Sequence, residues 1–296
     1  MEATTRSEPW DRAYLPGRFV PSVELYLDEY ARRSALARHE LAWREVPYGP
    51  DPAERLHFFP APEPDSPLVV FVHGGYWQQL TEADSSFAGR DVVAAGAAYA
   101  ALGYGLAPRV RLDGIVAMVR RAVLWLHRNA GDLGVDRERI LLAGHSAGAQ
   151  LVGMCLVEGW LPEAMRPSDL ACAAVLMSGL YELEPVRHSS VGAAIGLSAA
   201  QAAANSLVRQ LHAGLPPLVV ARGVDEPTGF ADQQRWLVSG AVALGVPVTD
   251  LVVAGRNHFD LPLGMGDPAD PVGRALLAQV GLLQDGTGNQ VADRRA

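Results

Sequence analysis

The stretch Leu141-Leu-Ala-Gly-His-Ser-Ala-Gly148 decides the fold, because it joins an apolar run directly to a Gly-x-Ser-x-Gly turn. The residues that follow, 149–156, suit a helix. In a strand, tight turn and helix of this kind, Gly144 and Gly148 let the turn tighten and lift the Ser146 hydroxyl above a sheet. An ordinary glycine-rich turn is the alternative interpretation. The motif predicts Ser146 as a candidate nucleophile.

Working outward from this motif, short apolar runs recur along the chain and predict buried strands. They lie at Leu68–Val72, Ala97–Leu102, Ile140–Ala143, Ala173–Met177, Leu218–Ala221 and Val248–Val253. Helical stretches separate them, and the clearest has apolar residues at intervals of three and four between Leu112 and Leu126. This alternation predicts an α/β fold with a mainly parallel sheet and helices on both faces. Ahead of it, Leu41–Val46 and Arg55–Phe59 are expected as antiparallel strands, after a helix over Pro21–Leu41.

The chain is expected to be one domain over residues 1–283, since no internal repeat interrupts it. Residues 284–296 read as a C-terminal tail. Between about residues 181 and 215 the regular spacing of predicted strands is interrupted by a segment rich in small residues, and a helix is expected there over Val191–Asn205. Such an insertion after a strand commonly covers an active site, so a small helical lid is expected here.

The composition excludes several classes of protein. All 25 basic side chains are Arg, so no Lys is available as a Schiff-base nucleophile, a Walker-A phosphate ligand or a catalytic base. The net charge of −8 argues against binding to a phosphate backbone. The polar N-terminus and the short apolar runs predict a cytoplasmic protein that binds neither nucleic acid nor a membrane. The two cysteines, Cys155 and Cys172, form no disulfide framework and are expected to be structural.

A second candidate element follows the run Leu68–Val72, where His73-Gly-Gly-Tyr-Trp77 places a glycine pair at the end of a strand. A turn of this type can aim backbone N–H groups at a developing oxyanion. The expected donors are Gly74, Gly75 and the residue after the nucleophile, Ala147. His73 is expected to have a structural role, with its ring bonded to the loop.

A serine hydroxyl needs a base, and the base needs an acid that fixes its tautomer. His258 follows the last predicted strand through a short loop and is the expected base. His188 and His212 fall in the insertion and are less well placed. Asp225 follows the run Leu218–Ala221 and is the expected acid. The competing carboxylates are Glu226, Asp232 and Asp250.

No cluster of ligands resembles a metal site, and His39 and His57 are isolated along the sequence. The glycine pair around Tyr104 lacks the third glycine of a dinucleotide fingerprint. The sequence therefore predicts neither a metal nor a cofactor.

With these residues in place, the sequence resembles the α/β-hydrolase superfamily and, more narrowly, the kynurenine formamidase (arylformamidase) family. The resemblance extends over roughly residues 11–283. It rests on Asp11-Arg-Ala-Tyr14, His73-Gly-Gly-Tyr-Trp77, Gly144-His-Ser-Ala-Gly-Ala149, Ser178-Gly-Leu-Tyr-Glu-Leu183, Asp225 with Phe230 and Gln233, and Asn257-His-Phe259. Gln150 and Asn205-Ser-Leu207 depart from the family pattern, which has His and Ser-Pro there.

The resemblance implies hydrolysis of an N-formyl arylamine, such as N-formylkynurenine or a secondary-metabolite precursor, with release of formate. It implies Ser146 as nucleophile, His258 as base and Asp225 as acid. Tyr76, Trp77 and Tyr181 are expected to stack on the aryl group, at about 0.5–1.5 kcal/mol per aromatic pair. The partner expected is this small molecule, and the oligomeric state stays open, a homodimer included.

Two other functions compete with this one. A short-acyl carboxylesterase of the His-Gly-Gly lipase type would share all the machinery and differ in its preferred substrate. A non-catalytic interaction protein on a hydrolase scaffold is the second alternative. Such proteins typically lose a member of the triad, whereas candidates for all three are present here.

Overall fold

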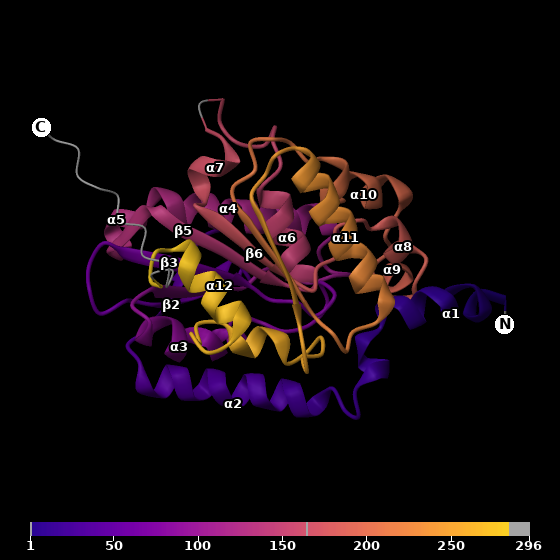
Figure 1. Cartoon of the computed structure of the whole chain (residues 1–296), viewed down its shortest axis with the longest axis horizontal. Helices are drawn as coiled ribbons and strands as arrows, with labels where there is room; N and C mark the ends of the chain where they lie inside the picture. Colours follow the sequence, from indigo (N-terminus) through magenta and orange to yellow (C-terminus); the bar gives the residue numbers. More distant parts are fainter. Residues whose placement is uncertain (1, 164, 284–296) are drawn as a thin grey trace, which may run out of the picture.

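The computed structural model describes residues 2–163 and 165–283, and within them the chain forms one eight-stranded sheet covered by helices on both faces (Figure 1). The strands are β1 (Arg44–Pro47), β2 (Arg55–Phe59), β3 (Ser66–Val72), β4 (Ala98–Leu102), β5 (Val135–His145), β6 (Ala173–Met177), β7 (Leu218–Gly223) and β8 (Val248–Val253). The α-helices are α1 (Glu2–Tyr14), α2 (Glu24–Glu40), α3 (Gly89–Ala94), α4 (Leu112–Arg128), α5 (Ala130–Leu133), α6 (Ala147–Cys155), α7 (Pro167–Leu170), α8 (Glu184–Arg187), α9 (Ser190–Ala194), α10 (Ala199–Ala204), α11 (Thr228–Ala243) and α12 (Pro271–Gln279). Short 3₁₀ helices are η1 (Pro16–Phe19), η2 (Ser86–Ala88), η3 (Leu207–Arg209) and η4 (Leu261–Gly264).

The strand order β1-β2-β4-β3-β5-β6-β7-β8 confirms the predicted α/β sheet. β1 and β2 are antiparallel to their neighbours, whereas the strands from β4 to β8 run parallel. Three predicted strands, at Arg55–Phe59, Ala173–Met177 and Val248–Val253, have the observed bounds. In a parallel sheet of this order the carboxyl ends of the strands share one edge, and ligands bind there.

Each face of the sheet packs against its own group of helices. On one face, α4, α6 and α11 bury side chains such as Ile115, Leu151 and Leu237. On the other face, α2, α3 and α12 bury side chains such as Ala37, Val92 and Leu276. Figure 1 shows α2 running along that side of the sheet. Because both faces are covered, β3 is buried along its whole length, which explains its continuous apolar sequence.

The insertion over residues 181–215 forms the short helices α8, α9, α10 and η3 instead of one helix over Val191–Asn205. Its first half packs against α1: the N–H of Ser190 donates to Asp11 Oδ1 at 2.6 Å, and the ring of His188 stacks on Trp10 at 5.6 Å. The predicted tail, 284–296, lies outside the described residues. Among the described helices, none is long and apolar enough to cross a membrane.

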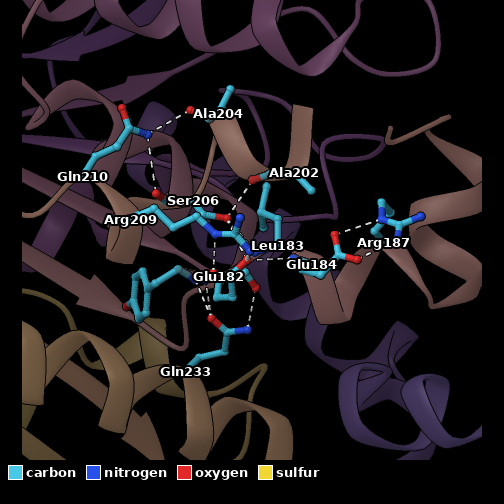
Figure 2. Close-up of polar contacts among 11 residues, drawn as sticks. Glu182, Leu183, Glu184, Arg187, Ala202, Ala204, Ser206, Arg209, Gln210 and Gln233 are labelled. Carbon is cyan, nitrogen blue, oxygen red and sulfur yellow. Dashed lines mark hydrogen bonds and ion pairs between the residues drawn. The ribbon is translucent and has the colours of Figure 1, made fainter. Parts of the chain in front are cut away.

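A polar network fastens this insertion to α11 (Figure 2). Gln233 Oε1 accepts the N–H groups of Tyr181 and Glu182, both at 2.7 Å, and its Nε2 donates to the Glu182 carbonyl at 2.8 Å. Within the insertion, the Arg209 guanidinium donates two hydrogen bonds, of 2.7 and 2.9 Å, to the Glu182 carboxylate. Gln233 Nε2 also lies 3.2 Å from the hydroxyl of Tyr14 at the end of α1. The insertion is thereby tied to both α11 and the N-terminal helix.

Candidate active site

The turn between β5 and α6 has the strained geometry of a nucleophile elbow. β5 ends at His145, α6 begins at Ala147, and Ser146 between them has φ 56° and ψ −121°. A side chain at Gly148 would collide with the carbonyl oxygen of Val72, so only glycine fits there. Positive φ at a non-glycine residue is costly and is concentrated at functional sites. The predicted strand, turn and helix around Ser146 are therefore confirmed.

His258 is buried beside a carboxylate, and that carboxylate belongs to Glu226. His258 Nδ1 lies 3.1 Å from Glu226 Oε2, and both side chains are almost completely shielded from solvent. The other oxygen, Oε1, accepts hydrogen bonds from the Ser178 hydroxyl and from the Gly223 N–H, both at 2.6 Å. Phe230 packs its ring 4.5 Å from the His258 ring. These contacts fix the carboxylate in one orientation toward the imidazole.

The structure does not bring Asp225 to His258, which corrects the prediction for the acid. The Asp225 side chain is exposed, and its backbone N–H donates to the Arg256 carbonyl at 3.0 Å. β7 ends at Gly223, and the next turn directs Asp225 outward while Glu226 folds back against the strand end. Of the other competitors, Asp250 accepts a bond from Gln234, and Asp232 pairs with Arg235.

The loop that carries His258 is held by helix α2. The Tyr30 hydroxyl donates to the Phe259 carbonyl, and Asn257 Nδ2 donates to the Tyr26 hydroxyl at 2.9 Å. The rings of Tyr26 and Phe259 stack with centroids 5.5 Å apart. Helix α2 therefore positions the histidine loop, a role that nothing in its sequence pattern indicates.

The glycine pair after β3 lies against the elbow. A Cβ on Gly74 would lie 3.0 Å from Ser146 Cβ, and Gly75 has φ +91°. The N–H groups of Gly74, Gly75 and Ala147 donate to no protein acceptor within residues 2–163 and 165–283. All three predicted donors therefore lie next to Ser146 or on its turn, with unpaired hydrogens.

His73 has the structural role that was predicted. Its Nδ1 lies 2.9 Å from the Gly74 carbonyl, and its ring stacks on Tyr104 with centroids 4.2 Å apart. The Tyr104 hydroxyl also donates to the His73 carbonyl at 2.7 Å. Burial lowers the pKa of His73 to about 4, so the ring is neutral and stiffens the loop without adding charge.

A cavity of about 330 Å³ opens in front of Ser146 and His258. Its walls are largely apolar, with side chains of Leu15, Val23, Leu27, Tyr30, Leu80 and Phe259. Seven of the lining residues come from the segment 15–30, which comprises η1 and the start of α2. No lining residue belongs to 181–215 in the part of the chain that the structure describes, so the N-terminal segment covers the cavity instead of the predicted lid.

The three predicted aryl-binding aromatics separate in the structure. Tyr76 lines the cavity, and its hydroxyl donates to the Tyr14 carbonyl. Trp77 is fully buried in the core, because the positive φ angles of Gly75, Tyr76 and Trp77 turn its ring away from the cavity. Tyr181 is 1% exposed and packs its ring over Gly179. Of the three, the structure keeps only Tyr76 at the site.

The two departures from the family pattern meet in one network. Gln150 is fully buried; its Oε1 accepts the Trp77 indole N–H at 3.0 Å, and its Nε2 donates to the Asn205 carbonyl at 3.0 Å. Asn205 Nδ2 donates in turn to Asp113 Oδ1 at 2.8 Å. Gln150 thus links the glycine loop to the insertion, from behind the cavity.

His57, His188 and His212 lie away from the cavity, and His57 departs from its prediction. His212 Nε2 bonds to the Leu156 carbonyl at 2.9 Å, and His188 pairs with Glu184 at the surface. His57 is not isolated, since a ring nitrogen lies within 4.8 Å of carboxylate oxygens of Glu45 and Glu82. Arg55 already pairs with the Glu45 carboxylate at 2.8 Å. None of these three lines the cavity.

The chain is similar in sequence to several known proteins. The family model BD-FAE matches residues 57–161. The kynurenine formamidase of Salmo salar is 31% identical over 224 residues, which cover 73% of this chain and 74% of the salmon protein. The chain belongs to the kynurenine formamidase family. A second member, the kynurenine formamidase of Danio rerio, is 29% identical over 80% of this chain and 81% of its own length.

The fold agrees with this membership. A crystal structure of a protein from Silicibacter sp. tm1040 superposes with a TM-score of 0.79 at 27% identity, covering 89% of this chain and 97% of that chain. As a member of the kynurenine formamidase family with the α/β-hydrolase fold, the chain is a hydrolase.

Proposed function

We propose that this protein hydrolyses the formamide of an N-formyl arylamine, N-formylkynurenine or a related compound, to formate and the free arylamine. The main support is the buried pair of His258 and Glu226, with Nδ1 and Oε2 3.1 Å apart, beside the cavity that Ser146 also lines. In this proposal Ser146 is the nucleophile, His258 the base and Glu226 the acid. The partner in this proposal is the small-molecule formamide, and the proposed reaction uses neither metal nor cofactor.

The Glu226 carboxylate can only accept a hydrogen bond, so it keeps the proton of neutral His258 on Nδ1. Nε2 is then free to take the Ser146 proton as Oγ attacks the formyl carbon. The protonated imidazole next gives this proton to the leaving nitrogen when the C–N bond breaks. Water repeats the sequence on the formyl ester of Ser146, which releases formate and restores the serine.

The unpaired N–H groups of Gly74, Gly75 and Ala147 would hold the oxyanion of both tetrahedral intermediates. Each such donor is worth about 10²–10³ in rate. The formyl group is the smallest acyl group, so the apolar cavity is available to the aryl part of the substrate. Its walls of Leu27, Tyr30 and Phe259 suit a flat aromatic ring.

A comparison of two substrates tests this proposal against a short-acyl esterase, which would use the same triad. The kcat/KM for N-formylkynurenine should exceed that for p-nitrophenyl acetate. A kcat/KM for the ester far above that for the formamide would overturn the assignment in favour of an esterase. No hydrolysis of either substrate would favour the non-catalytic alternative.

A further inference from the structure

The residue before the nucleophile, His145, joins the two loops that the proposed reaction uses. Its side chain is 6% exposed and lines the cavity together with Ser146. Its Nε2 lies 2.8 Å from the backbone carbonyl of His258, and the two imidazole rings are 4.7 Å apart. On its other side, Nδ1 lies 3.2 Å from the point that a Cβ on Gly74 would occupy, and Ser146 Cβ lies 3.0 Å from the same point.

The partner of Nε2 fixes the tautomer of this histidine. A carbonyl oxygen can only accept, so Nε2 must carry the hydrogen. Burial, followed by the charge of His258, lowers the pKa of His145 well below its usual range, so the ring holds one hydrogen and not two. Nδ1 is therefore a bare acceptor on the side of the ring that faces Gly74 and the elbow.

A formamide and an ester differ in the hydrogen-bond partners that their leaving groups need beside His145. When the tetrahedral intermediate of a formamide collapses, the lone pair of the leaving nitrogen must face the protonated His258, which donates to it. The N–H of the same nitrogen then points away from His258 and needs an acceptor among the largely apolar walls of the cavity. The leaving oxygen of an ester carries no hydrogen, so it makes no such demand.

We propose that Nδ1 of His145 accepts the N–H of the scissile formamide as its C–N bond breaks, and that this contact favours formamides over esters. The contact moves no proton: the hydrogen stays on the leaving nitrogen, and His258 supplies the one that completes the arylamine. The inference rests on the proposed function and adds an element that selects the class of substrate. It makes His145 a catalytic residue in addition to a support for the His258 loop.

The substitution His145→Gln separates these two roles. The Gln Nε2 can still donate to the His258 carbonyl, whereas no acceptor replaces Nδ1 beside Gly74. The matched substrates are formanilide and phenyl formate, which share the formyl group and the ring. We expect kcat/KM for formanilide to fall by about 10- to 100-fold, and kcat/KM for phenyl formate to stay within about threefold. His188→Gln, at the exposed His188 outside the cavity, is the control and should leave both values unchanged.

Equal losses on the two substrates would assign His145 to loop positioning alone and overturn the proposal, as would no loss on either. If His145→Gln does not fold, His145→Asn is the second variant. Its Oδ1 can replace Nδ1 while its side chain is too short to reach the His258 carbonyl, so both substrates should lose activity with their ratio kept. A changed ratio would count against the proposal. If the wild-type protein cleaves phenyl formate but not formanilide, the proposed function itself fails and takes this inference with it.

Discussion

Replacing Glu226 by Gln is predicted to disable the base without disturbing its surroundings. Glu226 Oε1 accepts two hydrogen bonds of 2.6 Å, from Ser178 and Gly223, and only an oxygen can stay there. The amide group of Gln is thereby forced to direct its NH₂ at His258 Nδ1, which lies 3.1 Å from the present Oε2. Turning the amide around would set two N–H groups against each other, at a cost of about 1–3 kcal/mol.

An NH₂ group facing Nδ1 requires Nδ1 to be the bare nitrogen, so the proton moves to Nε2 and His258 can no longer take the Ser146 proton. A base held in the wrong tautomer costs about 10⁴ in kcat, or roughly 5 kcal/mol. The assay is kcat on N-formylkynurenine across the pH range, with circular dichroism to check the fold. Asp225→Asn is the matched control and should stay within about twofold, because Asp225 is exposed. Full activity in Glu226→Gln with loss of activity in Asp225→Asn would assign the acid to Asp225 instead of Glu226.

Three further predictions concern the cavity wall, the glycine loop and pH. Leu27→Ala removes an apolar contact from the cavity wall, so it should raise KM for aryl formamides by about tenfold and leave kcat unchanged. The control Leu25→Ala, at a position that is 66% exposed, should change neither constant. Equal effects of the two substitutions would contradict the assignment of Leu27 to the wall. Gly74→Ala should lower kcat by about tenfold or more, because its methyl group would lie 3.0 Å from Ser146 Cβ; unchanged kcat would place the oxyanion elsewhere. Burial lowers the pKa of His73 from 6.5 to about 4. Below pH 6.5 the His73 imidazole therefore binds a proton in the unfolded chain but stays neutral in the folded one until the pH nears 4. The free energy of unfolding from urea titrations should therefore fall as the pH drops from 6.5 to 4, and His73→Asn should lose about 3 kcal/mol less over that range; parallel curves would contradict this.

The elbow and the sheet could be predicted because their signals are local. A strand of the parallel sheet needs a continuous apolar run, and the turn at Ser146 needs glycine where the Val72 carbonyl approaches. The acid could be placed only at the end of β7. Asp225 and Glu226 are neighbours, and the choice between them depends on a turn in which Glu226 folds back onto the Gly223 N–H. Sequence spacing does not determine which of two adjacent carboxylates points inward.

The cover of the cavity and its aromatic wall depend on contacts between distant segments, which the sequence does not reveal. Gln233 of α11 binds the insertion at 181–215 away from the cavity, and Arg209 bonds to Glu182 within the insertion. The segment 15–30 covers the cavity at Ser146 instead. Trp77 is only two residues after Gly75, yet its positive φ turns the ring into the core, where the indole N–H donates to Gln150. The Ser178-Gly motif was part of the resemblance, but its bond to Glu226 appears only in three dimensions.

The role of Ser146 is tested by measuring the release of formate from N-formylkynurenine by the wild-type protein and by Ser146→Ala. The wild-type protein should release formate steadily, and the variant should lose about 10⁴-fold or more of this activity, because the triad acts as a unit. Ser190→Ala, at an exposed serine outside the cavity, should retain wild-type release. Formate release that survives unchanged in Ser146→Ala would contradict a mechanism through a formyl ester of this serine.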